Sequence, residues 1–327
     1  MSRTAATLTV VAAIALAACG ENGKATVTTS SSDVISPSVA ESGAAIETSA
    51  TSPAPTVAPV TYADAETAFG RGEYAEATGM FESYTRGNPD NAWGQYMLGL
   101  SAWKSGQHER ALQAFDSALQ IEPTHRKSLF NSARVLLETS QPEEALERVQ
   151  KALSIEPLSA EGLRLLGRAH AELGQNDEAV GAYRRALAID DSDVWAMNNL
   201  GYLYIQEGRS DAALPPLARA VEIRRNVPVF QNNLGTALER AGHLSDARNA
   251  YESALQSDST YEKASVGLAR VTARIEGTDT VAVDLAALSK EFQGEIEQWR
   301  TAEVLPDSTS AEPSVQASVM VRDTLAQ

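Results

Sequence analysis

Ser101 and Lys104 have the types and spacing of a nucleophilic serine and the lysine that removes its proton, in the pattern S-x-x-K. The run Lys-Ser-Gly at 104–106 superficially matches a second pattern of serine acyl-transfer enzymes. Both patterns fall at the end of a predicted helix, in a repeated unit whose geometry already accounts for them. We therefore expect no catalytic residues here and interpret the chain as a protein without enzymatic activity.

Histidines and paired carboxylates offer no better site. The four histidines are far apart and have no Cys, Asp or Glu at ligand spacing: His108, His125, His170 and His243. Glu143 and Glu144 fall in a predicted first helical turn, where carboxylates stabilise the helix dipole. The sequence thus predicts neither a metal nor a cofactor.

The N-terminal segment suggests a different chemistry, at Cys19. Arg3 precedes an apolar run over residues 5–18, which is shorter than the roughly 20 residues of a membrane-spanning helix and is typical of an export signal. The run ends in L-A-A-C-G at 16–20, which resembles the bacterial lipoprotein box. The resemblance implies cleavage after residue 18 and acylation of Cys19 on sulfur and nitrogen.

Cys19 is the only cysteine, so the chain forms no intramolecular disulfide and folds through packing alone. In a diderm organism, the glycine after it implies sorting to the outer membrane, facing the periplasm. A plain secretory signal or an uncleaved segment remains the alternative. The stretch 19–57 is rich in Ser, Thr, Pro and Ala and predicts a disordered linker, and 301–327 predicts a disordered tail.

Between these ends the chain repeats every 34 residues. Small residues at predicted helix crossings recur as Ala65, Gly99, Ala133, Gly167, Gly201 and Gly235, and a second column as Ala77, Ala111, Ala145, Ala179, Ala213 and Ala247. Bulky partners recur as Phe81, Phe115, Val149, Tyr183, Leu217 and Tyr251, and turn residues as Gly72, Gly106, Ser140, Gly174, Gly208 and Gly242. The pattern resembles the tetratricopeptide repeat (TPR), which implies two antiparallel helices, A and B, in each unit.

The resemblance predicts an all-α solenoid with six units at 58–91, 92–125, 126–159, 160–193, 194–227 and 228–261. The turn residue before each B helix should adopt a left-handed backbone. Pro215 and Pro216 depart from the pattern, and we expect helix B of the fifth unit to begin late because of them. Residues 262–300 should add capping helices. The last of these helices either caps the array or folds into its groove.

In TPR arrays the A helices line a concave groove, so the resemblance also identifies a candidate peptide-binding surface. Its residues are Trp93, Tyr96, Trp103, Lys127, Asn131, Arg134, Arg164, Arg168, Trp195, Asn198, Asn199, Tyr202 and Asn233. Asn131, Asn199 and Asn233 occupy the same repeat position, resembling an asparagine ladder that pairs with a peptide backbone. The alternative is that these amides satisfy neighbouring groups of the protein itself.

The distribution of charge gives a second indication of a binding surface. The chain carries a net charge of −16, which argues against nucleic-acid binding, yet basic residues recur at predicted groove positions. Such a trough would attract acidic partner segments, unless Glu138, Glu161 and Glu172 neutralise it. We predict a membrane-anchored scaffold of the cell envelope that binds proteins or peptide segments, with relatives by architecture in pilus assembly, outer-membrane protein assembly and envelope protease regulation. A non-lipidated soluble adaptor is the alternative.

Overall fold

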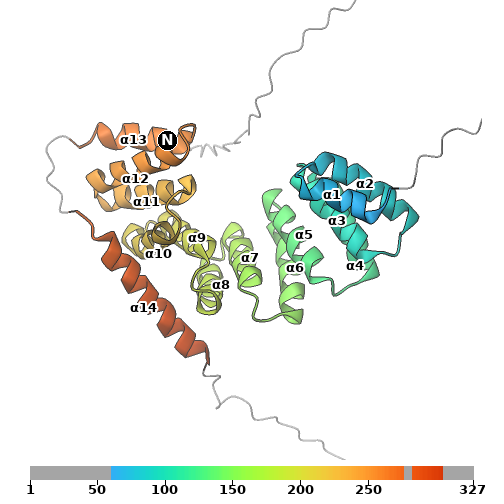
Figure 1. Ribbon diagram of the computed structural model, residues 1–327. Helices are drawn as coiled ribbons and strands as arrows, with labels where there is room; N and C mark the ends of the chain where they lie inside the picture. The colour runs from blue at the N-terminus through green and yellow to red at the C-terminus, as the bar shows by residue number, and fades with distance from the viewer. Residues whose placement is uncertain (1–59, 276–281, 305–327) are drawn as a thin grey trace, which may run out of the picture. The chain divides into compact units, whose positions relative to one another are not determined.

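The computed structural model describes residues 60–275 and 282–304, and these residues form helices and turns without a β-strand. The predicted all-α solenoid is confirmed, because the helices follow one another as antiparallel pairs (Figure 1). The predicted signal, Cys19, the linker and most of the tail lie outside the described residues. None of the described helices combines the length and the apolar character that a membrane span requires.

Each predicted unit contains one helix pair. The A helices are α1 (Tyr62–Gly70), α3 (Ala92–Lys104), α5 (Arg126–Glu138), α7 (Ala160–Glu172), α9 (Val194–Gln206) and α11 (Pro228–Ala241). The B helices are α2 (Tyr74–Gly87), α4 (His108–Ile121), α6 (Pro142–Ile155), α8 (Asn176–Ile189), α10 (Ser210–Ile223) and α12 (Leu244–Ser257). Two further helices follow, α13 (Glu262–Thr272) and α14 (Leu285–Val304).

Small residues allow the two helices of a pair to cross closely. A Cβ atom built at Gly167 would lie 2.7 Å from two ring carbons of Tyr183, and one at Gly201 would lie 2.5 Å from Leu217 Cγ. Real carbon–carbon contacts are longer, so at these two positions the close crossing depends on glycine, whereas the first unit combines Ala65 with Phe81, both fully buried. In the third unit the two helices cross at Ala133 and Val149, where a smaller facing side chain leaves room for the Cβ of alanine, and both residues are fully buried.

The turns between A and B helices also behave as predicted. All six turn residues have a positive φ, from 57° at Ser140 to 92° at Gly242. Glycine adopts this left-handed conformation without steric cost, whereas serine adopts it under strain. The fifth B helix differs from expectation: α10 begins at Ser210, 34 residues after α8 begins at Asn176, and contains Pro215 and Pro216 in its interior.

The expectation of a late start for α10 is therefore wrong. Pro215 and Pro216 lack the N–H groups that would bond the carbonyls of Asp211 and Ala212, at a cost of roughly 3 kcal/mol or more. Packing offsets this cost, because Pro216 and Leu217 are buried and α10 contacts α9, α11 and α14.

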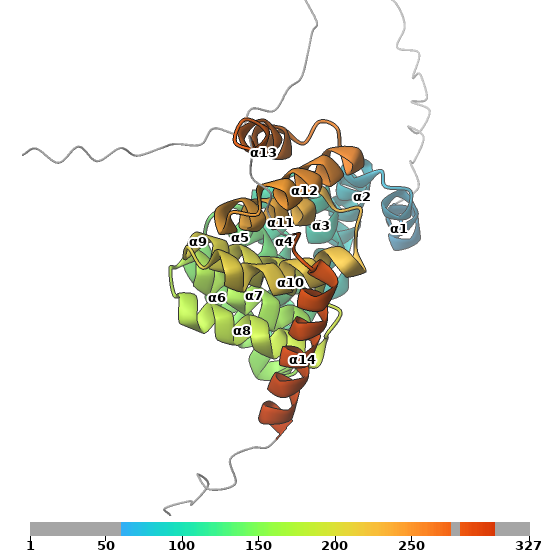
Figure 2. The same ribbon diagram turned by 90° about the vertical axis from the view of Figure 1, so that its left-hand side faces the viewer.

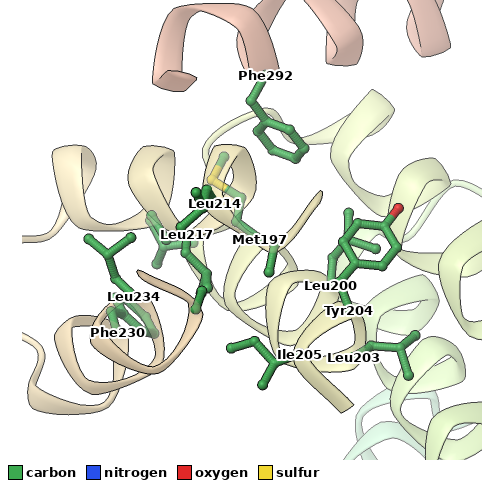
Figure 3. Packing of buried hydrophobic residues seen from close by; sticks show 14 of the residues in the cluster. Met197, Leu200, Leu203, Tyr204, Ile205, Leu214, Leu217, Phe230, Leu234 and Phe292 are labelled. Carbon is green, nitrogen blue, oxygen red and sulfur yellow. The ribbon is translucent and has the colours of Figure 1, made fainter. Parts of the chain in front are cut away.

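The C-terminal helices occupy different places. Helix α13 continues the array by packing on α11 and α12. Helix α14 packs mainly against the B helices α8 and α10 (Figure 2). Its Phe292 and Ile296 are 1% exposed, and Phe292 points toward Met197 and Leu214 (Figure 3). The helix therefore lies outside the predicted groove.

Candidate functional site

The serine–lysine pair has a structural role. Ser101 is fully buried in α3, and its Oγ donates to the carbonyl of Met97 at 2.8 Å. The Nζ of Lys104 lies 4.8 Å from the centre of the Trp103 ring, in a cation–π contact. Neither group is placed to assist the other.

The A helices form one continuous face, called here the inner face. Successive A helices from α3 to α13 contact one another directly, whereas the B helices stand on the opposite side, where α14 packs. Side chains that project from the A helices away from the B helices therefore share one surface. This is the surface on which the sequence placed the candidate peptide-binding residues.

Two of the three ladder asparagines bond to neighbouring repeats. The Nδ2 of Asn131 donates to the Tyr96 hydroxyl at 3.2 Å, and its Oδ1 accepts from Arg134 at 3.1 Å. The Nδ2 of Asn233 donates to Asn198 Oδ1 at 2.9 Å. Asn131 and Asn233 are 7% and 6% exposed, so their amides link adjacent A helices.

Asn199 differs from the other two in its accessibility, although its Oδ1 accepts from Asn198 Nδ2 at 3.5 Å and its side chain bonds to the Tyr183 phenol. It is half-buried and lines a pocket of about 430 Å³ between α7 and α9. Tyr202 and Gln206 of α9 and Arg168 and Glu172 of α7 complete the polar part of this pocket, which we call the inner pocket. Tyr183 forms part of its wall, and burial raises the pKa of the Tyr183 phenol well above its usual range, so the phenol stays protonated.

One helical stripe of α9 carries the accessible groups. Trp195, Asn199, Tyr202 and Gln206 are spaced four, three and four residues apart, which places them on one side of a helix. Trp195 is 42% exposed and Tyr202 is 47% exposed, while most of α9 is buried. Large aromatic side chains and amides thus alternate along the inner face of this helix.

Most basic groups of the inner face are paired within the protein. Four arginines bond to carboxylates, in the pairs Arg134–Glu161 (2.5 Å), Arg164–Asp193 (2.8 Å), Arg168–Glu172 (2.8 Å) and Arg270–Glu239 (2.6 Å). Arg240 donates to the Ile205 carbonyl at 2.7 Å. Glu138 instead accepts from Trp103 Nε1 at 2.7 Å. These pairs reduce the attraction that the inner face would exert on acidic segments.

Aromatic residues gather at the other end of the inner face. Trp93 donates from Nε1 to the Tyr62 hydroxyl at 2.6 Å, lies 5.0 Å from Tyr96 between ring centres, and is covered by Lys127 at 4.8 Å. His125 packs 5.2 Å from Tyr96, and burial lowers the pKa of its imidazole. Trp93 is 41% exposed, so part of this cluster is open to a partner.

The structure therefore places all thirteen candidate residues on A helices but divides them by accessibility. Tyr96, Asn131, Asn198 and Asn233 are buried, whereas Trp93, Lys127, Trp195 and Tyr202 are exposed. The remaining ones are half-buried: Trp103, Arg134, Arg164, Arg168 and Asn199. Peptide binding by these residues stays a prediction, and the inner pocket is where it is best supported. Sequence reasoning missed Gln206, although its spacing from Tyr202 placed it on the same stripe.

Solved structures similar to this chain are helical-repeat proteins. A tetratricopeptide repeat protein from Parabacteroides merdae shares 15% identity and a TM-score of 0.55, over 64% of this chain and 82% of the other. TTC0263 from Thermus thermophilus, a thermophilic TPR protein, shares 21% identity and a TM-score of 0.49, over 56% and 100%. YrrB, described as a TPR protein with an unusual peptide-binding site, shares 20% identity and a TM-score of 0.43, over 57% and 96%.

At these identities the likeness concerns the fold alone. A comparison with curated protein sequences finds no match. A tetratricopeptide repeat family model matches residues 62–125, 130–194 and 232–290, and a second model of the same repeat matches 182–214. Such repeats act as scaffolds for protein–protein interaction and in general carry out no catalysis. With more than half of its residues matched by the first model, the chain belongs to the tetratricopeptide repeat family.

Proposed function

We propose that this protein is a lipid-anchored scaffold of the bacterial cell envelope, which binds an extended segment of a partner protein across the inner face of α9. The observation that supports the binding proposal is the stripe Trp195, Asn199, Tyr202 and Gln206 beside the inner pocket. Its groups suit a peptide better than a charged ligand, because the neighbouring Arg168 and Glu172 already pair with each other.

The stripe provides both kinds of contact that an extended chain needs. Each amide of Asn199 and Gln206 can donate to a peptide carbonyl and accept from a peptide N–H. Trp195 and Tyr202 lie two helical turns apart, about 10 Å along the axis, and offer apolar surface to two side chains of the partner. The partner would therefore be held by its backbone, with bulky side chains against the aromatic rings.

The test compares two asparagine variants. Partners are first captured on the full chain and identified by mass spectrometry, and the bound segment is then titrated calorimetrically as a synthetic peptide. Asn199→Ala should weaken binding by about 1 kcal/mol, or roughly fivefold, with only a small change in melting temperature. Asn131→Ala should instead lower the melting temperature, because the Asn131 amide links α5 to Tyr96 of α3.

Tyr202→Ala provides a second measurement at the same pocket. It should weaken binding by more than Asn199→Ala, since an exposed aromatic side chain supplies most of the apolar contact. An affinity that neither Asn199→Ala nor Tyr202→Ala alters would contradict the proposal.

The anchor is a separate part of the proposal. It is supported by the sequence L-A-A-C-G at 16–20 and by the absence of any other cysteine in the chain. Three acyl chains on Cys19 would hold the protein on a membrane, since each buried CH₂ contributes about 0.8 kcal/mol. Cys19→Ser should move the protein from the membrane fraction to the soluble fraction and abolish labelling by radioactive palmitate. A mature protein without fatty acid would exclude the anchor but leave the binding proposal intact.

A further inference from the structure

The side of the array formed by the B helices, called here the outer face, contains a second pocket, between α10 and α12. It has a volume of about 460 Å³, and Leu285 and Ala286 at the start of α14 line it. Its apolar floor consists of side chains from three helices, Ala218, Val221, Leu234 and Ala250. Its polar rim includes Arg225, Gln231, Asn249 and Ser253. We call it the outer pocket.

The repeat relates the outer pocket to the surface that α14 covers. Ala218, Glu222 and Arg225 occupy the positions that Arg184, Ala188 and Asp191 hold 34 residues earlier. The residues at those earlier positions contact the C-terminal half of α14. The guanidinium of Arg184 lies 5.1 Å from the centre of the Trp299 ring, and Arg300 donates to the Ala188 carbonyl and to Asp191, each at 3.0 Å. The outer pocket is therefore the corresponding place one repeat further along.

Two sequence differences change what the outer pocket can bind. Arg225 replaces Asp191, so the outer pocket has a cation at the position where Arg300 of α14 contacts an anion in the preceding repeat. Ala218 replaces Arg184, which removes a long side chain from above the floor and leaves space for an apolar group. A ligand analogous to Trp299 and Arg300 would therefore have an aromatic side chain followed by a carboxylate.

The other charged groups of the pocket leave Arg225 available. Glu222 accepts from Arg219 at 2.6 Å and from Ser289, and Asp246 accepts from the Val283 amide at 3.0 Å. Arg225 is exposed, and no carboxylate of the described residues lies within ion-pair distance of it.

Gln231 offers a hydrogen-bond acceptor to a ligand in this pocket. Its side chain is 7% exposed and lines the pocket, and its Nε2 donates to the Arg225 carbonyl at 3.1 Å. Within the described part of the chain, its Oε1 has no donor. This oxygen is open to the pocket, where it can accept a hydrogen bond from a peptide N–H.

We propose that the outer pocket binds a short segment of a partner protein in which an aromatic residue directly precedes an acidic one. The ring occupies the floor at Ala218 and Val221, the carboxylate pairs with Arg225, and a backbone N–H donates to Gln231. Because its volume is about 460 Å³ and the start of α14 borders it, the pocket takes a few residues and not a long helix. This site lies on the opposite side of the array from the inner pocket.

The test uses α14 itself as the source of the probe. A fluorescent nonapeptide with the sequence of residues 294–302 and the change Arg300→Glu carries the required Trp–Glu pair. Its binding to the full chain is measured by fluorescence anisotropy, with an expected Kd on the order of 100 μM for a probe of this size. The unchanged nonapeptide should bind more weakly, because it brings Arg300 to Arg225.

A charge exchange then locates the site. Arg225→Glu should weaken binding of the Trp–Glu peptide roughly five- to tenfold and strengthen binding of the unchanged Trp–Arg peptide. Gln231→Leu should weaken both peptides by a similar factor. Arg224→Glu, a neighbouring exposed change that does not line the pocket, is the control and should leave both affinities unaltered. The proposal is overturned by unsaturated binding at millimolar peptide, by equal binding to wild type and Arg225→Glu, or by an equal effect of Arg224→Glu.

Discussion

Replacing Gly167 by alanine tests whether close helix crossing, and not helix propensity, determines this repeat column. A Cβ at residue 167 would lie 2.7 Å from two ring carbons of Tyr183 and 3.0 Å from a third. Ordinary contacts begin near 3.4 Å, so the ring would have to move by about 0.7 Å. Tyr183 is only 2% exposed, and overpacking at such a site costs about 1–3 kcal/mol.

Helix propensity acts in the opposite direction. Alanine is favoured over glycine by about 1 kcal/mol in a helix, which offsets part of the clash and leaves a net loss of up to about 2 kcal/mol. Gly181 of α8 is the matched control, because it is exposed and a Cβ there would meet nothing within 4 Å. Gly181→Ala should therefore raise stability by about 0.5–1 kcal/mol.

Urea unfolding followed by circular dichroism measures both variants. Comparing midpoints suits a repeat array, whose unfolding need not be two-state. A double variant adds a test, because Gly167→Ala with Tyr183→Val reproduces the pair Ala133 and Val149 of the third unit. Its loss should be smaller than the sum of the two single losses by about 1–2 kcal/mol. If Gly167→Ala stabilises the array as Gly181→Ala does, the close-crossing explanation is wrong.

Three further perturbations test local features. Ser140→Gly should stabilise the array by about 1 kcal/mol, because serine there has a φ of 57°, and the reverse change Gly106→Ser should cost a similar amount in thermal melts. Burial lowers the pKa of His125, so the unfolded state binds more protons below about pH 6.5 and stability should fall as the pH drops from 7.5 to 5.5. His125→Asn keeps an acceptor for the Ser128 amide at the start of α5 and should reduce that fall, which is read from melting temperatures at both pH values. Glu239→Gln should cost about 1–3 kcal/mol and speed hydrogen exchange in α13, since the buried Glu239 accepts from Arg270 of α13 and from Arg274 just after it; unchanged exchange would refute this.

The sequence predicted the repeat register because each unit contacts only its neighbours, so a structural requirement recurs at a fixed spacing. The crossing residue Gly167 and the turn residue Ser140 could both be assigned from their columns alone. His125 shows where this reasoning stops. It occupies the capping position of Asn91, Ser159 and Asp193 in other units, so the signal was present, but histidine is not an expected cap.

Non-repeating contacts could not be derived in the same way. The amphipathic pattern of α14 predicted a buried stripe with Phe292 and Ile296, but a stripe does not specify what covers it. The position of Asn131 likewise predicted an inner-face amide without revealing that Tyr96 would accept its hydrogen bond. For such contacts the partner side chain comes from another unit, and its orientation depends on packing that sequence spacing does not fix.

Comparison of equivalent stripes explains why α9 is the centre of the proposed inner-face site. In α5 the stripe holds Asn131 and Arg134, which bond to Tyr96, to each other and to Glu161, and in α7 it holds the paired Arg168 and Glu172. In α11 it holds Asn233 and Arg240, which bond to side-chain and carbonyl oxygens of α9.

These neighbouring stripes use their polar groups to hold the array together. On α9, the side chains of Tyr202 and Gln206 have no hydrogen-bond partner among the described residues, and the Trp195 ring lies 4.9 Å from the Phe230 ring in an edge contact. Contact between exposed aromatic rings and water is unfavourable, so covering these rings would lower the free energy. Every other side of α9 already packs against α7, α8, α10 or α11. A partner segment that covered Trp195 and Tyr202 would bury apolar surface without breaking any bond between repeats, which is possible on none of the three neighbouring stripes.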